Sequence, residues 1–175
     1  MEEAVERQWK LGALSHIGIV VRDMDEAIEY YSSIFGMGPF TTQVWELKDF
    51  LYRGKPANAR VKAGIAYSGR VFVELVQVLE GETAHTEFFG KHGEGMQHVA
   101  FTVDDMDKAL ADLEQKGIKP IMYYSMPIDL PGGSQSAGEG AAGKRRFLLT
   151  EAYLDSGKVG GTVIQLMHFK PLPAA

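Results

Sequence analysis

Two histidines occupy equivalent places in a repeated segment of the chain. Residues 14–28, LSHIGIVVRDMDEAI, return in altered form as residues 96–110, MQHVAFTVDDMDKAL, and superposing the two segments places His16 on His98. In each copy the histidine lies in an apolar run that leads through an aspartate-rich turn into a helical pattern. Neutral imidazole is the commonest metal ligand in proteins. The duplication therefore predicts a metal ion held between the two copies.

A polar residue in the closing strand of each copy extends this set. Glu74 lies within VFVELVQV and Gln165 within GTVIQLMH, each among apolar neighbours. A buried carboxylate is costly unless it is paired or bound to a metal. Two imidazoles, a carboxylate and an amide oxygen suit a divalent ion such as Zn, Ni, Co, Mn or Fe(II). We expect His16, Glu74, His98 and Gln165 to hold one such ion, although Gln165 is equally consistent with a pocket-lining amide that contacts substrate.

Side-chain alternation separates the two faces of the histidine strands. Gly18 shares a face with His16, and Ala100 shares a face with His98. Small residues beside each histidine are what a cavity wall requires. The opposite, bulkier face of each strand is expected to lie under a helix.

The periodicity predicts the same order of elements twice. The first module reads as a strand, a helix and three strands, at residues 14–21, 24–35, 40–47, 61–67 and 71–79. The second reads likewise, at residues 97–103, 106–116, 119–124, 146–149 and 162–168. A short helix is expected near Ala84 to Lys91 in the polar connector. The predicted fold class is α+β, with two tandem βαβββ modules forming an open, cup-like mixed sheet barrel.

The expected domain organisation follows from these modules. The chain divides into an N-terminal extension, a first module, a connector, a second module and a tail, at residues 1–13, 14–80, 81–95, 96–169 and 170–175. Residues 131–146 are rich in glycine, serine and alanine without an apolar period, and are expected to form a mobile loop within the second module.

Composition excludes several classes of protein. The chain has 175 residues, 45% of them hydrophobic, which is enough for a packed interior. No cysteine is present, so disulfides, thiolate ligands and a cysteine nucleophile are excluded. No apolar run is long enough for a membrane span, and the polar, acidic start is unlike a signal peptide. A net charge of −5 argues against a nucleic-acid partner. A cytoplasmic protein is expected.

Four segments of the chain resemble the vicinal oxygen chelate superfamily. They are HIGIVVRDMDEAIEYYSSIFGMGPF, VELVQ, KHGEGMQHVAFTVDDMDKAL and GTVIQL. The superfamily includes glyoxalase I, methylmalonyl-CoA epimerase, extradiol dioxygenases and bleomycin-resistance proteins, and the KHGEGMQHVAFTVDD segment is most similar to the epimerase-like branch. The resemblance extends over residues 14–169. It implies the duplicated fold, a small-molecule substrate with a carbonyl, such as an acyl-CoA or α-keto compound, and a homodimer.

The resemblance also implies a metal ligand at each of the four positions. The last position usually carries a glutamate that acts as the catalytic base, whereas this chain has Gln165, and an amide cannot usefully accept a proton near neutral pH. Glu74, loosely ligated, is therefore the first candidate for the base. Glu46, in QVWELKDF, is the second.

Three functions fit these residues. The first is a metal-dependent isomerase or lyase that polarises a carbonyl and moves the adjacent proton, as in epimerases and glyoxalases. The second is a non-haem Fe(II) ring-cleaving dioxygenase, because His16, His98 and Glu74 form a two-histidine, one-carboxylate set. The third is a metal-free binding or resistance protein on the same fold. His85 and His92, in the polar connector, are expected to be exposed to solvent.

Overall fold

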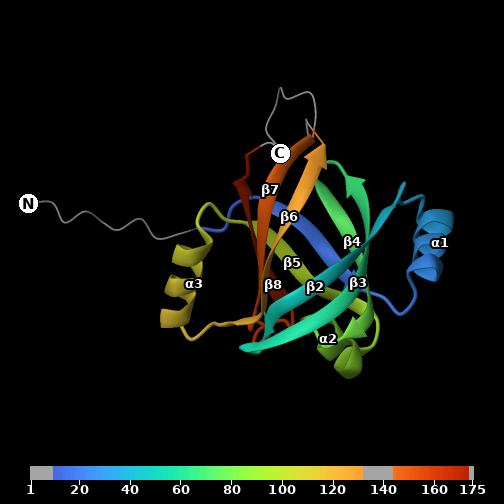
Figure 1. Cartoon of the computed structure of the whole chain (residues 1–175). Coiled ribbons are helices and arrows are strands. Elements are labelled where there is room, and N and C mark those ends of the chain that lie inside the picture. Colours follow the sequence, from blue (N-terminus) through green and yellow to red (C-terminus); the bar gives the residue numbers. More distant parts are fainter. Residues whose placement is uncertain (1–9, 132–143, 174–175) are drawn as a thin grey trace, which may run out of the picture.

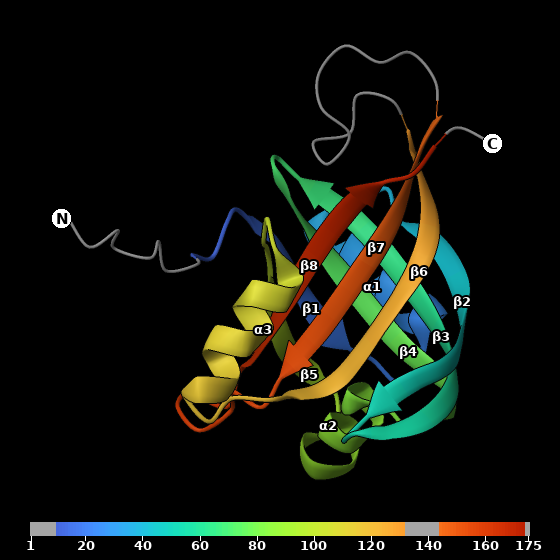
Figure 2. The ribbon, with the colours of Figure 1, turned by 60° about the vertical axis from the view of Figure 1, so that its left-hand side comes forward.

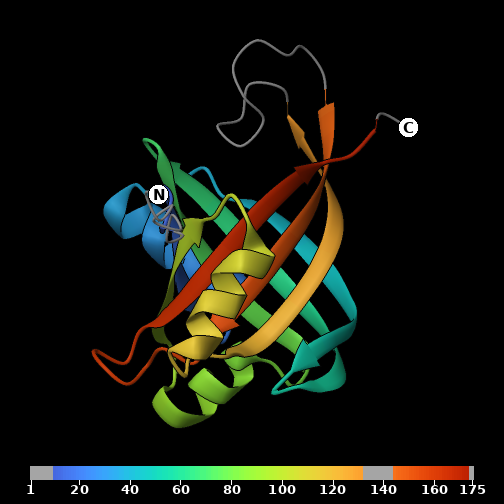
Figure 3. The ribbon, with the colours of Figure 1, turned by 90° about the vertical axis from the view of Figure 1, so that its left-hand side faces the viewer.

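Eight strands form a closed barrel in the part of the chain that the computed structural model describes, residues 10–131 and 144–173 (Figure 1). The strands are β1 (Leu14–Val20), β2 (Thr41–Tyr52), β3 (Lys55–Ser68), β4 (Val71–Gly81), β5 (Gly95–Thr102), β6 (Pro120–Pro131), β7 (Lys144–Leu154) and β8 (Val163–Pro171). The helices are α1 (Met24–Phe35), α2 (Ala84–His92) and α3 (Met106–Gln115). The three helices lie on the outside of the barrel (Figures 1 and 3).

The strand order follows the sequence duplication. Around the barrel it is β1-β4-β3-β2-β6-β7-β8-β5, so each module contributes four neighbouring strands. Within each module the first and last strands are parallel, β1 to β4 and β5 to β8, and the other pairs are antiparallel. The expected fold class and the two tandem βαβββ modules are confirmed. The modules pair with each other within one chain.

The two junctions between the modules differ in extent. Strands β1 and β5 pair along most of their length, whereas β2 and β6 share only the pairs Leu51 with Tyr123 and Tyr52 with Met122. Within the described residues, the rest of β2 forms strand pairs only with β3. Figure 2 shows β2 and β6 curving around the barrel interior on this side. The barrel is thus closed on this side by pairing at one end of β2 and β6.

Helices α1 and α3 cover the outer faces of the strands, whereas α2 lies at one end of the barrel (Figure 1). Asp23 caps α1 by accepting hydrogen bonds from the backbone N–H groups of Asp25 and Glu26, and Asp105 caps α3 in the same way through Lys108 N–H. Buried Met24 of α1 packs with Leu75 of β4, and Met106 of α3 packs with Leu166 of β8. The bulky faces of the strands therefore lie under helices, which leaves the histidine faces for the interior.

Several strands run further than the periodicity predicts. Strand β7 extends from Lys144 to Leu154, whereas the apolar pattern predicted a strand ending at Leu149. The reason is that its interior face continues with the polar residues Glu151 and Tyr153, which interrupt the hydrophobic signal. Residues 132–143 of the predicted loop, like residues 1–9 and 174–175, lie outside the described residues. No helix in the described ranges is both long and apolar enough to cross a membrane.

Candidate metal centre

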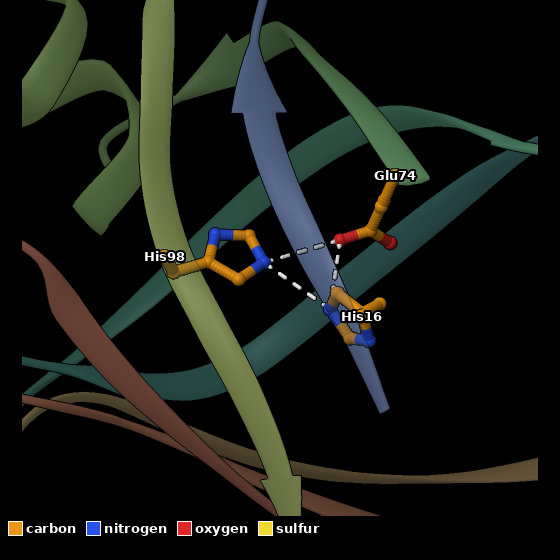
Figure 4. Close-up of side chains that lie close together, drawn as sticks. All are labelled: His16, Glu74 and His98. Carbon is orange, nitrogen blue, oxygen red and sulfur yellow. Dashed lines mark hydrogen bonds and ion pairs between the residues drawn. The ribbon is translucent and has the colours of Figure 1, made fainter. Parts of the chain in front are cut away.

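Three neighbouring strands bring His16, Glu74 and His98 together inside the barrel (Figure 4). The two Nε2 atoms of His16 and His98 are 3.2 Å apart, and each lies 3.4 Å from Oε2 of Glu74. Ligands that stand about 2.0–2.1 Å from a tetrahedral ion are about 3.3 Å from one another. The three atoms therefore have the spacing of one face of a metal coordination shell.

Strand register explains why these residues meet. Gly18 of β1 is paired with Glu74 on β4 and with His98 on β5, so it lies between two of the ligands. A Cβ atom on Gly18 would stand 1.8 Å from Cε1 of His98. The missing side chain at this position provides the space that the His98 ring occupies.

Gln97 determines which nitrogen of His98 carries the proton. Its amide Nε2 donates to the backbone carbonyl of Ala84 at 2.7 Å, which turns Oε1 toward Nδ1 of His98 at 2.9 Å and Nδ1 of His85 at 2.7 Å. A carbonyl oxygen only accepts hydrogen bonds, so both Nδ1 atoms are protonated. Nε2 of His98 then keeps its lone pair, directed at Glu74 and His16. Such an outer hydrogen bond is typical of a metal-binding histidine.

The expectation that His85 is exposed to solvent is wrong. Its ring is 3% exposed and lines the barrel cavity, and burial followed by the nearby His98 lowers its pKa to about 4. His85 is the second residue of α2, which has Thr83 and Thr86 in a capping box at its N-terminus and packs against β1, β4 and β5. The polar composition of the connector concealed this contact. His92, by contrast, is exposed as predicted.

Gln165 holds the same position in the second module as Glu74 in the first. It pairs with Ala100, two residues after His98, as Glu74 pairs with Gly18, two residues after His16. Its side chain is 1% exposed, and within the described structure neither amide atom has a hydrogen-bond partner. Leaving a buried amide unsatisfied costs roughly 1–3 kcal/mol. An orphaned amide at this position fits a fourth oxygen donor to a bound cation.

The charges of the cluster also suit a cation. Burial raises the pKa of the Glu74 carboxyl, but its hydrogen bonds and charge interactions with His16 and His98 outweigh burial and hold the pKa well below its usual range. Burial lowers the pKa of His98, and Glu74 offsets this only in part. At neutral pH a carboxylate therefore faces a neutral His98 ring.

The cluster opens onto a cavity of about 420 Å³ inside the barrel. His16, Glu74 and His85 lie in its wall, together with residues that are mostly apolar or aromatic. The apolar and aromatic lining residues are Trp45, Leu47, Val61, Ala63, Ile65, Tyr67, Phe72, Val76, Tyr124, Met126, Ile128, Leu130, Leu149, Tyr153, Met167 and Phe169. Among the described lining residues there is no lysine or arginine. The cavity therefore has the volume and lining of a small-molecule site.

Residues 15–128 match the family model of the Glyoxalase/Bleomycin resistance protein/Dioxygenase superfamily. The chain belongs to this superfamily. Mouse mitochondrial methylmalonyl-CoA epimerase is 30% identical over 114 residues, which cover 65% of this chain and 58% of the epimerase. The 4-hydroxyphenylpyruvate dioxygenase of Legionella pneumophila strain Corby is 28% identical over 126 residues, 68% of this chain and 34% of that enzyme. The chain thus spans about three fifths of the length of the mouse and human epimerases that it matches.

Solved structures agree on the fold of this superfamily member. A methylmalonyl-CoA epimerase in complex with methylmalonyl-CoA and NH4+ has a TM-score of 0.54 at 22% identity, covering 91% of this chain and 95% of that one. The epimerase from Mycobacterium tuberculosis gives 0.52 at 19% identity, covering 98% and 95%. At these identities the likeness concerns the fold.

Glu46 is not brought into the cavity. On β2 the side chains of Trp45 and Leu47 line the interior, so strand alternation turns Glu46 outward. Its side chain is 62% exposed and lies 3.7 Å from Arg60 on the barrel surface.

Glu151 is an interior carboxyl that sequence reasoning missed. It lies on β7, is 7% exposed and lines the same cavity as His16 and Glu74. The Tyr124 hydroxyl donates a hydrogen bond to its Oε2. Burial, followed by the charge of Glu74, raises the pKa of Glu151 to about 7. The signal was present in the sequence as a glutamate between Thr150 and Ala152 in the otherwise apolar segment FLLTEAYL, but the predicted strand ended two residues earlier.

Proposed function

We propose that this protein is a metal-dependent isomerase or lyase that moves a proton on the carbon next to a substrate carbonyl. The observation that carries the proposal is the convergence of His16, Glu74 and His98 beneath an apolar cavity. Relatives in the superfamily include an epimerase and the lactoylglutathione lyase of Schizosaccharomyces pombe, which is 29% identical over 112 residues.

His16, Glu74, His98 and Gln165 would hold the metal ion. A divalent ion bound there would act as a Lewis acid that stabilises negative charge on the substrate oxygen. The neutral His98 ring leaves its lone pair available, and Gln97 keeps it in that tautomer. The apolar cavity walls would limit the water around the reacting carbon. Glu74 was the first candidate base, but its Oε2 faces both histidines, which favours a role as ligand over one as proton acceptor.

The lining of the cavity supports a compact substrate with an apolar group beside its carbonyl. Glu74, Asp129 and Glu151 are the charged side chains in the described lining, and all three are acidic. The phosphates of an acyl-CoA would find no cation there, so only the acyl end of such a substrate suits the interior. An aryl or alkyl α-hydroxy or α-keto compound matches the wall better. A homodimer and a cytoplasmic location remain predictions.

A ring-cleaving Fe(II) dioxygenase is the second candidate. Two histidines and one carboxylate on one face of a coordination shell are the ligand set of many non-haem Fe(II) oxygenases, and 4-hydroxyphenylpyruvate dioxygenases are among the relatives. Oxygen consumption with catechols in the presence of Fe(II) would favour this candidate. A metal-free binding protein, the third possibility from the sequence, would bind ligands equally well after removal of all metal.

Metal analysis combined with proton exchange tests the proposal. We expect the purified protein to bind a single divalent ion and to catalyse deuterium uptake from D2O at the carbon next to the carbonyl of 2-hydroxyacetophenone, phenylpyruvate or methylmalonyl-CoA, followed by NMR. The His16→Ala/His98→Ala variant should lose both properties, whereas His92→Ala, at an exposed position, should keep them. Stoichiometric metal in the double variant would contradict the site. Absence of exchange with all three probes would contradict the reaction.

A further inference from the structure

The cavity contains a carboxyl group that no metal-ligand role explains. Of its three acidic residues, Glu74 faces the histidines and Asp129 is exposed to solvent. Glu151 is buried and joined to the Tyr124 hydroxyl. A buried acid in a largely apolar wall carries a desolvation cost, so its presence invites a chemical explanation.

Strand order places Glu151 across the cavity from Glu74. In the closed sequence β1-β4-β3-β2-β6-β7-β8-β5, β7 is four strands away from β4 in either direction. On β7, Tyr153 pairs with Gln165 and Glu151 pairs with Met167, one inward-facing position further along. The Tyr153 ring lies 5.2 Å from that of His98. A substrate held at the histidine cluster would therefore lie between its ligand wall and Glu151.

We propose that Glu151 is the general base of the reaction and that Tyr124 positions it. The proposal rests on the function proposed above. The C–H bond next to the carbonyl breaks, and its proton passes to Oε1 of the Glu151 carboxylate. The electron pair of that bond forms the carbon–carbon double bond of an enolate, and the carbonyl π electrons move onto oxygen. For an α-hydroxy ketone such as 2-hydroxyacetophenone, this enolate carries a hydroxyl group on the carbon that lost its proton. Glu151 returns its proton to the former carbonyl carbon and the hydroxyl proton moves to the former carbonyl oxygen. The hydroxyl carbon thereby becomes the new carbonyl, with no other reactant.

Two features support this role. A base works best when its pKa lies near the operating pH, and the pKa of Glu151, raised to about 7 by burial and by Glu74, meets that condition. The Tyr124 hydroxyl occupies Oε2, which fixes the plane of the carboxylate and leaves Oε1 for the substrate proton. Gln165, at the position equivalent to Glu74, offers no comparable acceptor.

Glu151→Gln tests the proposal by turnover. With the metal-loaded protein and 2-hydroxyacetophenone, we expect kcat for deuterium uptake to fall by about 100-fold or more, with KM and metal content unchanged. Glu114→Gln, the same exchange of carboxylate for amide on the outer face of α3, serves as the matched control. Retention of wild-type kcat in Glu151→Gln would overturn the proposal.

Tyr124→Phe tests whether the Tyr124 hydroxyl positions Glu151 or whether Tyr124 only packs in the cavity wall. The Tyr124 hydrogen bond lowers the pKa of Glu151, so its loss should raise that pKa. We expect the acidic limb of the pH–kcat profile to move to higher pH in Tyr124→Phe, with KM unchanged. An unmoved profile would show that Tyr124 does not act through Glu151.

Proton release on ligand binding tests Glu151 without turnover. Benzohydroxamate, which resembles a planar enediolate, binds metals as an anion, and titration calorimetry in buffers of different ionisation enthalpy counts the protons released. At about pH 8, above the pKa of Glu151, the wild type should retain the ligand proton, whereas Glu151→Gln should release about one proton more. Equal release would overturn the role of Glu151 even where exchange is found. A metal-loaded wild type that does not bind the hydroxamate would contradict the proposed function, and with it the role of Glu151.

Discussion

The two modules differ in the polar residue that the last strand of each places beside its histidine strand. Glu74 closes the first module as a carboxylate held by His16 and His98, whereas Gln165 closes the second as a buried amide without a partner among the described residues. The two copies therefore keep the same position for a polar side chain, but one carries a carboxylate and the other an amide. One acid lies among the ligands, and the second interior acid, Glu151, lies on a different strand.

Gln165→Met tests the cost of the orphaned amide. Methionine has a similar volume and no hydrogen-bonding requirement, so the metal-free protein should gain roughly 1–3 kcal/mol in its free energy of unfolding, measured with urea. The same variant should bind Zn²⁺ less tightly in a competition with a chelator, because one oxygen donor is lost. A variant with lower metal-free stability and unchanged Zn²⁺ affinity would contradict both the unsatisfied amide and its role as ligand.

At the scale of elements, the site depends on the three adjacent strands β4, β1 and β5. The parallel pairing of β1 with β4 and its antiparallel pairing with β5 bring three side chains to Gly18, the residue that lacks one. Helix α2 places His85 within hydrogen-bond distance of Gln97, and Gln97 in turn fixes the tautomer of His98. Exposed apolar side chains on α1, namely Tyr30, Ile34 and Phe35, lie away from this site.

Gly18→Ala should disrupt the centre through the backbone of β1. The added Cβ would stand 1.8 Å from the His98 ring, so either the ring or the strand must move. We expect a loss of about 1–3 kcal/mol in the free energy of unfolding, as for other overpacked interiors, and loss of metal binding by elemental analysis. Gly90→Ala is the matched control, because a Cβ there meets nothing within 4 Å, and in helix α2 it should stabilise by roughly 0.5–1 kcal/mol. Unaltered metal content in Gly18→Ala would contradict the expectation that a side chain at this position displaces the His98 ring.

At the scale of the whole molecule, closure of the barrel determines the electrostatics of its interior. Strands from both modules enclose Glu74 and Glu151 with apolar side chains, and no lysine or arginine lies in the described part of that lining. The pKa values of the two acids move in opposite directions. The histidine partners of Glu74 hold its pKa low despite burial, whereas burial and the charge of Glu74 raise the pKa of Glu151.

The stability of the metal-free protein should reflect the burial of Glu151. Its pKa is about 7 in the folded chain and about 4.5, the ordinary value of a glutamate, in the unfolded chain, so between these pH values the folded state binds the extra proton. Stability then falls as pH rises through this window. Relative to wild type, Glu151→Gln should be nearly equal in stability at low pH and more stable by about 3 kcal/mol above neutrality. Urea titrations across pH measure the difference. Parallel curves for the two proteins would contradict a buried, titrating Glu151.

Local patterns in the sequence determined the duplicated module, the fold class and the equivalent strand positions of the four predicted ligands. Alternation along a strand is a short-range rule, so His16, Glu74 and His98 could be placed on interior faces without a structure. The same rule places Glu46 on the opposite face of its strand from Trp45 and Leu47. Which of these two faces lines the interior depends on how the barrel closes, and local sequence does not determine it.

Only the tertiary structure decided the contacts across the barrel. His85 lies in a segment of polar composition, yet it is buried and hydrogen-bonded to Gln97. Glu151 lies on β7 beyond the point at which the apolar pattern predicted the strand to end. The positions of both residues depend on strand register and on the closure of the barrel, which places β7 opposite β4. Periodicity reports which side of its own strand a residue occupies. What that residue faces depends on the pairing of strands that are distant along the chain.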